Sequence, residues 1–94
     1  NKENDWLTLS FANKNDIWFH TKDIHGSHVI LKASQPINDE ILVRCAEIAA
    51  QHSKAKNSSN VPVDYCPVQF VKKPHGAKPG MVVFTNNKTL NVKP

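Results

Sequence analysis

Residues 16–31 constrain the fold of this chain more than any other stretch. They predict two short strands joined by a turn, because residues 17–20 and 29–33 are rich in aromatic or β-branched side chains and Gly26 and Ser27 interrupt them. The second run is continuous enough in Val, Ile and Leu to predict a strand that is buried on both faces. A central hairpin therefore organises the predicted sheet.

The first predicted strand carries two large aromatic residues side by side. Neighbouring residues of a strand point to opposite faces of a sheet, so Trp18 and Phe19 should face opposite sides. Aromatic residues in a small domain usually belong to its core. We expect one of these two residues to be buried, and His20 to be the accessible member of the strand.

The same stretch concentrates polar side chains. Three of the five histidines of the chain fall within nine positions, together with a serine, a threonine, a lysine and an aspartate. These residues are His20, Thr21, Lys22, Asp23, His25, Ser27 and His28. A purely structural hairpin does not need this density, which therefore indicates a surface that contacts a ligand. Backbone N–H groups and hydroxyls around Gly26 and Ser27 are suited to receive a phosphate.

Two helices are predicted. Residues 4–12 begin with a capping-type Asn4 or Asp5 and predict a short N-terminal helix, although Leu7, Leu9 and Phe11 also alternate as in a strand. Asn38 caps a longer helix with Asp39 and Glu40 in its first turn, where the helix dipole favours negative charge. Its continuous apolar face comprises Ile41, Cys45, Ile48, Ala49 and His52. Small side chains let this helix lie close against a sheet, at Ala46, Ala49 and Ala50.

The second half of the chain predicts short strands. Residues 61–66 and 68–71 have β-type composition. Pro62 and Pro67 restrict these segments to sheet edges or bulges, because proline has no N–H to donate to a neighbouring strand.

Residues 81–85 and 89–92 predict a closing hairpin. The predicted fold class is α+β, with a mixed or mostly antiparallel sheet packed by one long helix and a short N-terminal helix beside it. The length of 94 residues predicts a single domain over residues 1–94. The polar start without Met predicts a C-terminal fragment of a longer protein.

Cysteine use and hydropathy indicate the compartment. The apolar runs are far shorter than the roughly 20 residues of a membrane-spanning helix, so no membrane partner is expected. Two cysteines are too few for a disulfide framework, and we expect Cys45 and Cys66 to be reduced and at least partly buried. A cytoplasmic location fits this pattern.

Charge is distributed unevenly along the chain. Residues 1–47 hold five basic and seven acidic side chains, a net charge of −2, whereas residues 48–94 hold seven lysines and one aspartate, a net charge of +6. Polyanions are the natural partners of the second half.

Five groups of residues, in this order along the chain, together resemble the NFACT-R domain. They are residues 16–20 (Asp-Ile-Trp-Phe-His), 26–30 (Gly-Ser-His-Val-Ile), Ala49-Ala50 with Ser53-Lys54, 63–65 (Val-Asp-Tyr), and 71–74 (Val-Lys-Lys-Pro) with 76–82 (Gly-Ala-Lys-Pro-Gly-Met-Val). NFACT-R is the C-terminal module of fibronectin-binding-protein-A-like (RqcH-type) bacterial proteins and of their archaeal and eukaryotic relatives, Tae2 and NEMF.

The resemblance implies an RNA-binding module that is not itself an enzyme and needs no cofactor. Such proteins bind the large ribosomal subunit carrying a stalled peptidyl-tRNA, and recruit charged tRNA so that a C-terminal tail is added to the stalled chain. The implied partners are tRNA or large-subunit rRNA, the large ribosomal subunit and the other domains of the same protein. Family members usually carry a further strand and a glycine-containing segment before the position of Asn1, so the sheet formed by residues 1–94 is expected to lack its first strand.

The predicted RNA contacts are of two kinds. Lysines bind phosphates without sequence preference, and five lysines in two basic loops are assigned this role: Lys54, Lys56, Lys72, Lys73 and Lys78. A more specific polar site comprises His20, Ser27 and His28. The alternative for the lysines is a solvated loop that favours solubility.

Two rival functions use the same residues differently. A fibronectin-binding adhesion module at the cell surface is the first, after the activity that named the bacterial members. A metal-dependent enzyme using the histidine cluster is the second, although the spacing of His20, His25 and His28 matches no common zinc pattern. A hydrolase with Ser27 as nucleophile and His28 as base is disfavoured, because adjacent strand residues point to opposite faces.

Overall fold

The structure is a computed structural model that describes residues 12–24, 26–34, 37–72 and 82–94. In chain order its elements are β1 (Ile17–Thr21), β2 (Val29–Leu31), α2 (Asp39–Gln51), β3 (Val61–Pro67), the 3₁₀ turn η1 (Val68–Phe70), β4 (Val71–Lys72), β5 (Val83–Phe84) and β6 (Lys88–Val92). Four strands form one sheet in the order β2-β1-β3-β6, and β4 and β5 form a separate pair. Every pairing is antiparallel.

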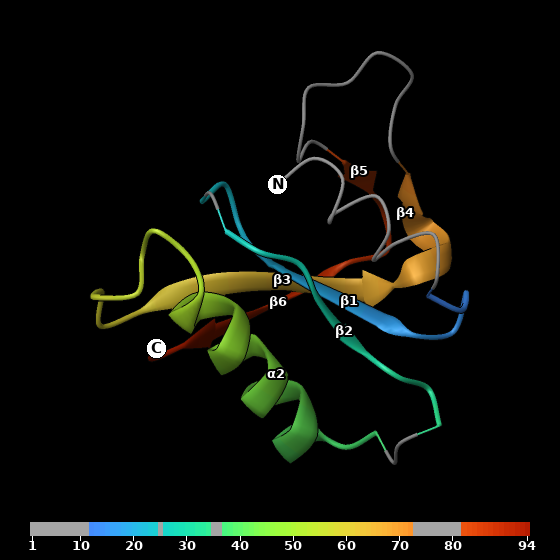
Figure 1. The fold of residues 1–94 in the computed structure, drawn as a ribbon, viewed down its shortest axis with the longest axis horizontal. Helices are drawn as coiled ribbons and strands as arrows, with labels where there is room; N and C mark the ends of the chain where they lie inside the picture. The colour runs from blue at the N-terminus through green and yellow to red at the C-terminus, as the bar shows by residue number, and fades with distance from the viewer. Residues whose placement is uncertain (1–11, 25, 35–36, 73–81) are drawn as a thin grey trace.

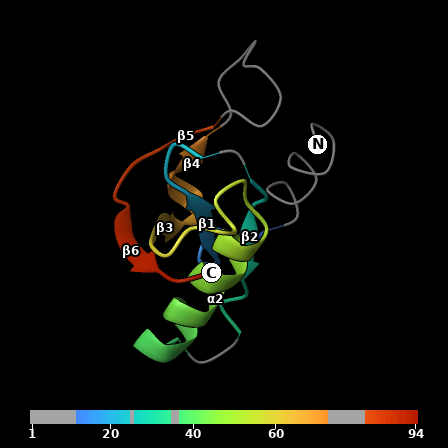
Figure 2. The same cartoon turned by 90° about the vertical axis from the view of Figure 1, so that its left-hand side faces the viewer.

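Helix α2 packs against all four strands of the larger sheet. Figure 1 shows the helix crossing the sheet, and Figure 2 shows β4 and β5 at the opposite end of the molecule from it. The predicted hairpin over residues 16–31 is confirmed, since β1 pairs with β2 from Ile17 opposite Leu31 to Phe19 opposite Val29.

The predicted fold class is wrong. The described residues contain one α-helix, of 13 residues, and more of them lie in antiparallel strands, so the fold is β-rich rather than a sheet organised by one long helix with a second helix beside it. The predicted N-terminal helix falls on residues 4–12, of which 4–11 lie outside the described residues. The strands are two to seven residues long and come from segments far apart in the sequence, so local periodicity gives the sheet too little weight relative to the helix.

Helix α2 begins where the sequence predicts. The backbone N–H of Ile41 donates to the Asn38 side-chain oxygen at 2.9 Å, which is the expected N-cap bond. Three small residues, Ala46, Ala49 and Ala50, are the ones fully buried against the sheet. The placement of His52 on the apolar face is wrong, because His52 is the exposed C-cap residue.

Two apolar clusters lie on opposite faces of the sheet. The face toward α2 contains Phe19, stacked against Tyr65 with ring centroids 5.5 Å apart. The other face contains Trp18 and Cys66, covered by residues of η1, β4 and β5. Trp18 and Phe19 therefore face opposite sides, as predicted. Both are buried, with 1% and 0% of their surface exposed, so the prediction that only one would be buried is wrong.

The prolines of β3 contradict their predicted edge position, because β3 lies between β1 and β6. Both prolines sit at the ends of the β1–β3 pairing. Pro67 lies opposite Ile17, and Pro62 lies just beyond the last pair, Thr21 opposite Val63. The Pro62 carbonyl accepts from Lys22 N–H at 2.9 Å, so the side of Pro62 without an N–H faces β1 where that strand has ended.

Three other strand predictions are wrong. β2 is an edge strand with Val29 and Ile30 only partly buried, rather than buried on both faces. Residues 68–71 form the 3₁₀ turn η1 and the start of β4. β5 pairs with β4, and β6 pairs with β3, so residues 81–85 and 89–92 form no hairpin with each other.

Both cysteines are free, Cys45 partly buried and Cys66 buried, as predicted. Burial raises the pKa of the Cys66 thiol to about 11, with the nearby Asp64 carboxylate acting in the same direction. Burial also raises the pKa of Cys45. Within the described ranges, no helix is long and apolar enough to cross a membrane.

Candidate nucleic-acid interface

A cluster of aromatic rings occupies the sheet face opposite α2. Trp18 contacts Phe84 of β5 with ring centroids 4.7 Å apart and lies parallel to His20, two residues along the same strand, at 5.8 Å. His28, just before β2, meets Trp18 and His20 edge-on at 5.5 and 5.1 Å. We call these four residues the ring cluster. Trp18 is its buried base, whereas His20 and His28 are partly exposed.

His20 is held by the chain that follows it. Its Nδ1 lies 2.8 Å from the Thr21 carbonyl oxygen and its Nε2 lies 3.2 Å from the Gly26 carbonyl oxygen. Carbonyl oxygens only accept hydrogen bonds, so each contact is a hydrogen bond when that nitrogen carries a proton. A neutral imidazole carries one N–H, so His20 donates to one of the two carbonyls in each tautomer while its ring lies against both. Its side chain therefore holds the β1–β2 connection (residues 22–28, described at 22–24 and 26–28).

The β1–β2 connection is tied to the α2–β3 loop (residues 52–60) through Gly26 and Ser53. These two residues form an isolated antiparallel bridge, and a Cβ atom on Gly26 would lie 2.9 Å from Ser53 Cβ and 3.1 Å from Ser53 Cα. Only glycine permits this approach. Ser53 is itself fixed, because its hydroxyl donates to the Ala50 carbonyl at 2.8 Å and accepts from Ala55 N–H at 3.1 Å.

A buried carboxylate, missed by the sequence reasoning, lies beside the ring cluster. Asp64 of β3 is opposite His20 in the sheet register and only 3% exposed. Its Oδ1 accepts from Thr89 Oγ1 at 2.6 Å and from Asn87 Nδ2 at 3.3 Å, and lies 3.8 Å from Lys22 Nζ. Asp64 thereby connects the start of β6 to the β1–β2 connection. The signal available in the sequence was a lone acidic residue in the basic half of the chain.

The structure brings only some of the predicted contacts together. Ser27 and His28 lie on the β1–β2 connection, and Lys54 and Lys56 lie exposed on the loop that the Gly26–Ser53 contact holds next to it. Lys72 is exposed on β4, which Figure 1 shows far from that loop. Lys73 and Lys78 lie outside the described residues, as does His25.

No group of three or more His, Cys, Asp or Glu side chains is placed to hold a metal ion in the part of the chain that the structure describes. His20 and His28 meet through their rings, and both His20 nitrogens face carbonyl oxygens. This arrangement does not favour the metal-dependent enzyme.

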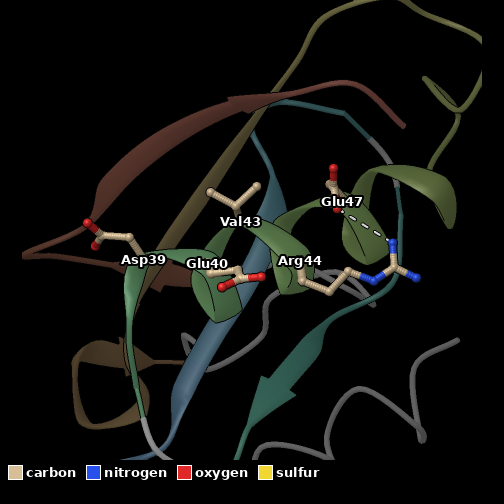
Figure 3. Close-up of a pocket in the computed structure, with 5 residues that line it drawn as sticks. All are labelled: Asp39, Glu40, Val43, Arg44 and Glu47. Carbon is tan, nitrogen blue, oxygen red and sulfur yellow. Dashed lines mark hydrogen bonds and ion pairs between the residues drawn. The ribbon is translucent and has the colours of Figure 1, made fainter.

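A second surface feature lies on the outer side of α2. An open hollow of about 440 Å³ there is lined by Asp39, Glu40, Val43, Arg44 and Glu47, with Arg44 Nη1 3.5 Å from Glu47 Oε1. Figure 3 shows these five side chains and the ion pair. Three of the five lining residues are acidic, so the hollow is not suited to a polyanion. It lies on the other side of the sheet from the ring cluster.

Comparison of the sequence with known proteins shows the family of this chain. The family model for the NFACT protein RNA binding domain matches residues 1–86. The Rqc2 homolog RqcH of Bacillus subtilis (strain 168) is 50% identical over 94 residues, which are 100% of this chain and 16% of that protein. The coiled-coil domain-containing protein 25 homolog of Dictyostelium discoideum is 29% identical over 94% of this chain and 45% of its own length.

A solved structure agrees in fold. The structure of the C-terminal part of the fibronectin/fibrinogen-binding protein from Streptococcus suis superimposes with a TM-score of 0.90 at 44% sequence identity, covering 99% of this chain and 37% of that one. The chain spans about a sixth of the length of its bacterial relatives named RqcH. The family match extends over most of the sequence, and this chain belongs to the NFACT protein RNA-binding domain family.

Proposed function

We propose that this chain is the RNA-binding module of a cytoplasmic ribosome-associated quality-control factor. The observation that carries the proposal is the Gly26–Ser53 contact. It joins the segment bearing Ser27 and His28 to the loop bearing Lys54 and Lys56, and so makes one surface of two segments distant in sequence. A polyanion with both phosphates and bases matches a surface that offers ammonium groups beside a hydroxyl and aromatic rings.

The lysines supply the electrostatic part of binding. Lys54, Lys56 and Lys72 are exposed, and Lys73 and Lys78 belong to the same proposed set. Because the α2–β3 loop and β4 lie far apart (Figure 1), the lysines contact different phosphates along an extended RNA rather than one phosphate together. Lys22, half exposed and 3.8 Å from Asp64, joins this set from the β1–β2 connection.

The cellular role rests on the relatives. Proteins named Rqc2 homolog RqcH contain a segment 43–50% identical to this chain. We infer that the full-length protein binds large ribosomal subunits that carry peptidyl-tRNA on a stalled chain, and supports C-terminal tailing of that chain. The module contacts tRNA or large-subunit rRNA and itself catalyses no reaction.

Salt dependence of RNA binding tests the module. In the variant Lys54→Ala with Lys56→Ala, the slope of log K against log salt should fall by about one to two, since each phosphate contact to a single strand contributes roughly 0.7. Replacing the same two lysines by Arg should keep the slope, because the charge is kept. Arg44→Ala, on the outer side of α2, is the control for charge elsewhere and should leave the slope unchanged. Equal slopes for all four proteins would overturn the proposed contacts.

The ribosomal role needs a separate experiment. The full-length protein carrying the Lys54 and Lys56 replacements should cosediment less with large subunits bearing peptidyl-tRNA than the wild-type protein does, and the arginine variant should behave as wild type. Undiminished cosedimentation by the alanine variant would remove these two lysines from the ribosomal contact.

Fibronectin binding is the second candidate, favoured by the name of the Streptococcus suis protein whose C-terminal part shares this fold. Immobilised fibronectin should then retain the 94-residue chain, and RNA should compete if the same lysines bind both. Failure to retain the chain would remove this candidate.

A further inference from the structure

The packing of the ring cluster limits where a ligand ring can lie. The centroids of Trp18, His20 and His28 are 5.1 to 5.8 Å from one another, which is direct ring contact. No planar group fits between rings already in contact, so a base can stack only on an outward surface of the cluster.

The three rings are not equally available for such stacking. Trp18 is 1% exposed and forms the base of the cluster. His20 has both nitrogens against backbone carbonyls and acts on the β1–β2 connection. His28 is partly exposed, follows the exposed Ser27, and is supported from within by two other rings.

We propose that His28 is the stacking platform for one unpaired RNA base, with Ser27 beside it as a hydrogen-bonding hydroxyl. This inference rests on the proposed function and adds to it the class of RNA, a single-stranded segment. Aromatic stacking requires a base whose face is uncovered, whereas a duplex presents its backbone and the 2′-hydroxyls of its minor groove.

Contacts within the chain hold the described surroundings of His28 in place. The Gly26–Ser53 contact fixes the backbone two residues away, and Thr21 Oγ1 donates to the Ile24 carbonyl at 2.8 Å within the same connection. A platform held in place loses little conformational entropy when a base stacks on it. Lys54 and Lys56, on the adjoining loop, are placed to hold the phosphates that flank the stacked nucleotide.

The test compares two probes with the 94-residue chain. One is a single-stranded oligouridine of about 12 nucleotides, a length within the usual range of single-strand sites, with one central 2-aminopurine whose fluorescence reports stacking. The other is a blunt RNA duplex of the same length. His28→Ala should weaken binding of the single strand by about tenfold and abolish the 2-aminopurine change, while duplex binding stays within about twofold. His28→Phe, which keeps a flat ring, should restore both signals.

The other outcomes contradict either the stacking proposal alone or the proposed function as well. Unchanged single-strand affinity in His28→Ala, equal weakening for the duplex, or no rescue by His28→Phe would each exclude stacking on His28. In those cases the lysine-dependent salt slope is retained, so the proposed function survives. A wild-type chain that binds neither probe would overturn the proposed function and the stacking site with it. Thermal melts of both variants confirm that each is folded.

Discussion

The two faces of the sheet are built by different means. The face toward α2 is covered by a helix whose buried residues are alanines, and its fully buried ring, Phe19, stacks on Tyr65. The opposite face is covered by the short elements η1, β4 and β5, and Trp18 extends its cluster to partly exposed histidines. On the first face the backbone of α2 lies close to the sheet and covers it. On the second face the partly exposed histidine rings reach the surface.

We infer that the face toward α2 mainly stabilises this small domain, whereas the opposite face is the one available to a ligand. Small side chains let α2 lie flat on the sheet and leave little on that face for a ligand to contact. The rings of the opposite face are held from beneath by a fully buried indole, and from the side by the Gly26–Ser53 contact. The face proposed to bind RNA is thus held in place by residues of the fold, and the variants below distinguish residues that support the fold from residues that contact a ligand.

Trp18→Ala should have the largest effect. Removing a fully buried indole costs about 3–5 kcal/mol of unfolding free energy, a large part of the stability of a domain this small. Trp18→Phe should cost less, because it keeps a ring against Phe84 and the Trp18 Nε1 atom makes no hydrogen bond in the described part of the chain. Urea denaturation measures both. A loss below about 1 kcal/mol in Trp18→Ala would show that the sheet face carrying Trp18 contributes little to the stability of the domain.

Gly26→Ala should come next, at about 1–3 kcal/mol, because the added methyl group would meet Ser53 at 2.9 Å with Ser53 backbone close behind. Ser27→Ala, the adjacent exposed position, is the matched control and should change the unfolding free energy by less than about 0.5 kcal/mol. Equal stability of the two variants would mean that the connection and the loop move apart easily, and would weaken the case for a joint surface.

How well the sequence predicted these features depends on whether the signal was local. The start of α2 was predictable because Asn38 caps its own helix, and the hairpin of β1 and β2 because both strands lie within sixteen residues. The interior position of β3 was not, since its prolines are accommodated only because β1 is five residues long and ends beside Pro62. No local pattern shows the length of a partner strand.

The candidate site divides in the same way. Ser27 and His28 stood out by composition, but the role of His20 as a support depends on carbonyls of Thr21 and Gly26 that only the folded connection brings to its ring. Gly26 read as a turn residue, whereas its contact is with Ser53, 27 positions later. Trp18 faces one side of the sheet and Phe19 faces the other. Both are buried because a separate layer covers each face, and periodicity along the sequence does not reveal those layers.

We expect the stability of the fold to depend on pH through Asp16, the residue just before β1. The backbone N–H groups of Ala33 and Asn13 donate to the buried Asp16 carboxylate, at 2.7 and 2.8 Å, and with Lys32 at 3.2 Å they hold the pKa of Asp16 below its ordinary value of 3.8. A carboxylate with a lowered folded pKa stabilises the fold above its unfolded pKa, and this stabilisation is lost as pH falls through the folded value.

Asp16→Asn should therefore be less stable than wild type near neutral pH, and the difference should shrink as pH falls below about 4. Asp23→Asn, an exposed position at φ 54°, is the control for a carboxylate without these bonds. Unfolding free energies measured from neutral to acid pH decide the matter. A wild-type minus Asp16→Asn difference that does not depend on pH would show that the Asp16 charge does not contribute to stability.

The smallest expected effect concerns the two histidines of the ring cluster, and it separates support from contact most sharply. His20→Ala removes the hydrogen bond of one ring nitrogen to a backbone carbonyl, worth roughly 0.5–1.5 kcal/mol, together with ring contacts to Trp18 and His28, and should cost about 1–2 kcal/mol. His28→Ala removes edge contacts to Trp18 and His20 but leaves the connection bound through Gly26, so it should cost less than His20→Ala, about 1 kcal/mol. Thermal melts at one pH compare the two variants directly. If His28→Ala is the less stable of the pair, His28 supports the fold as His20 does, and the contact surface on this face narrows to Ser27 and the lysines beside it.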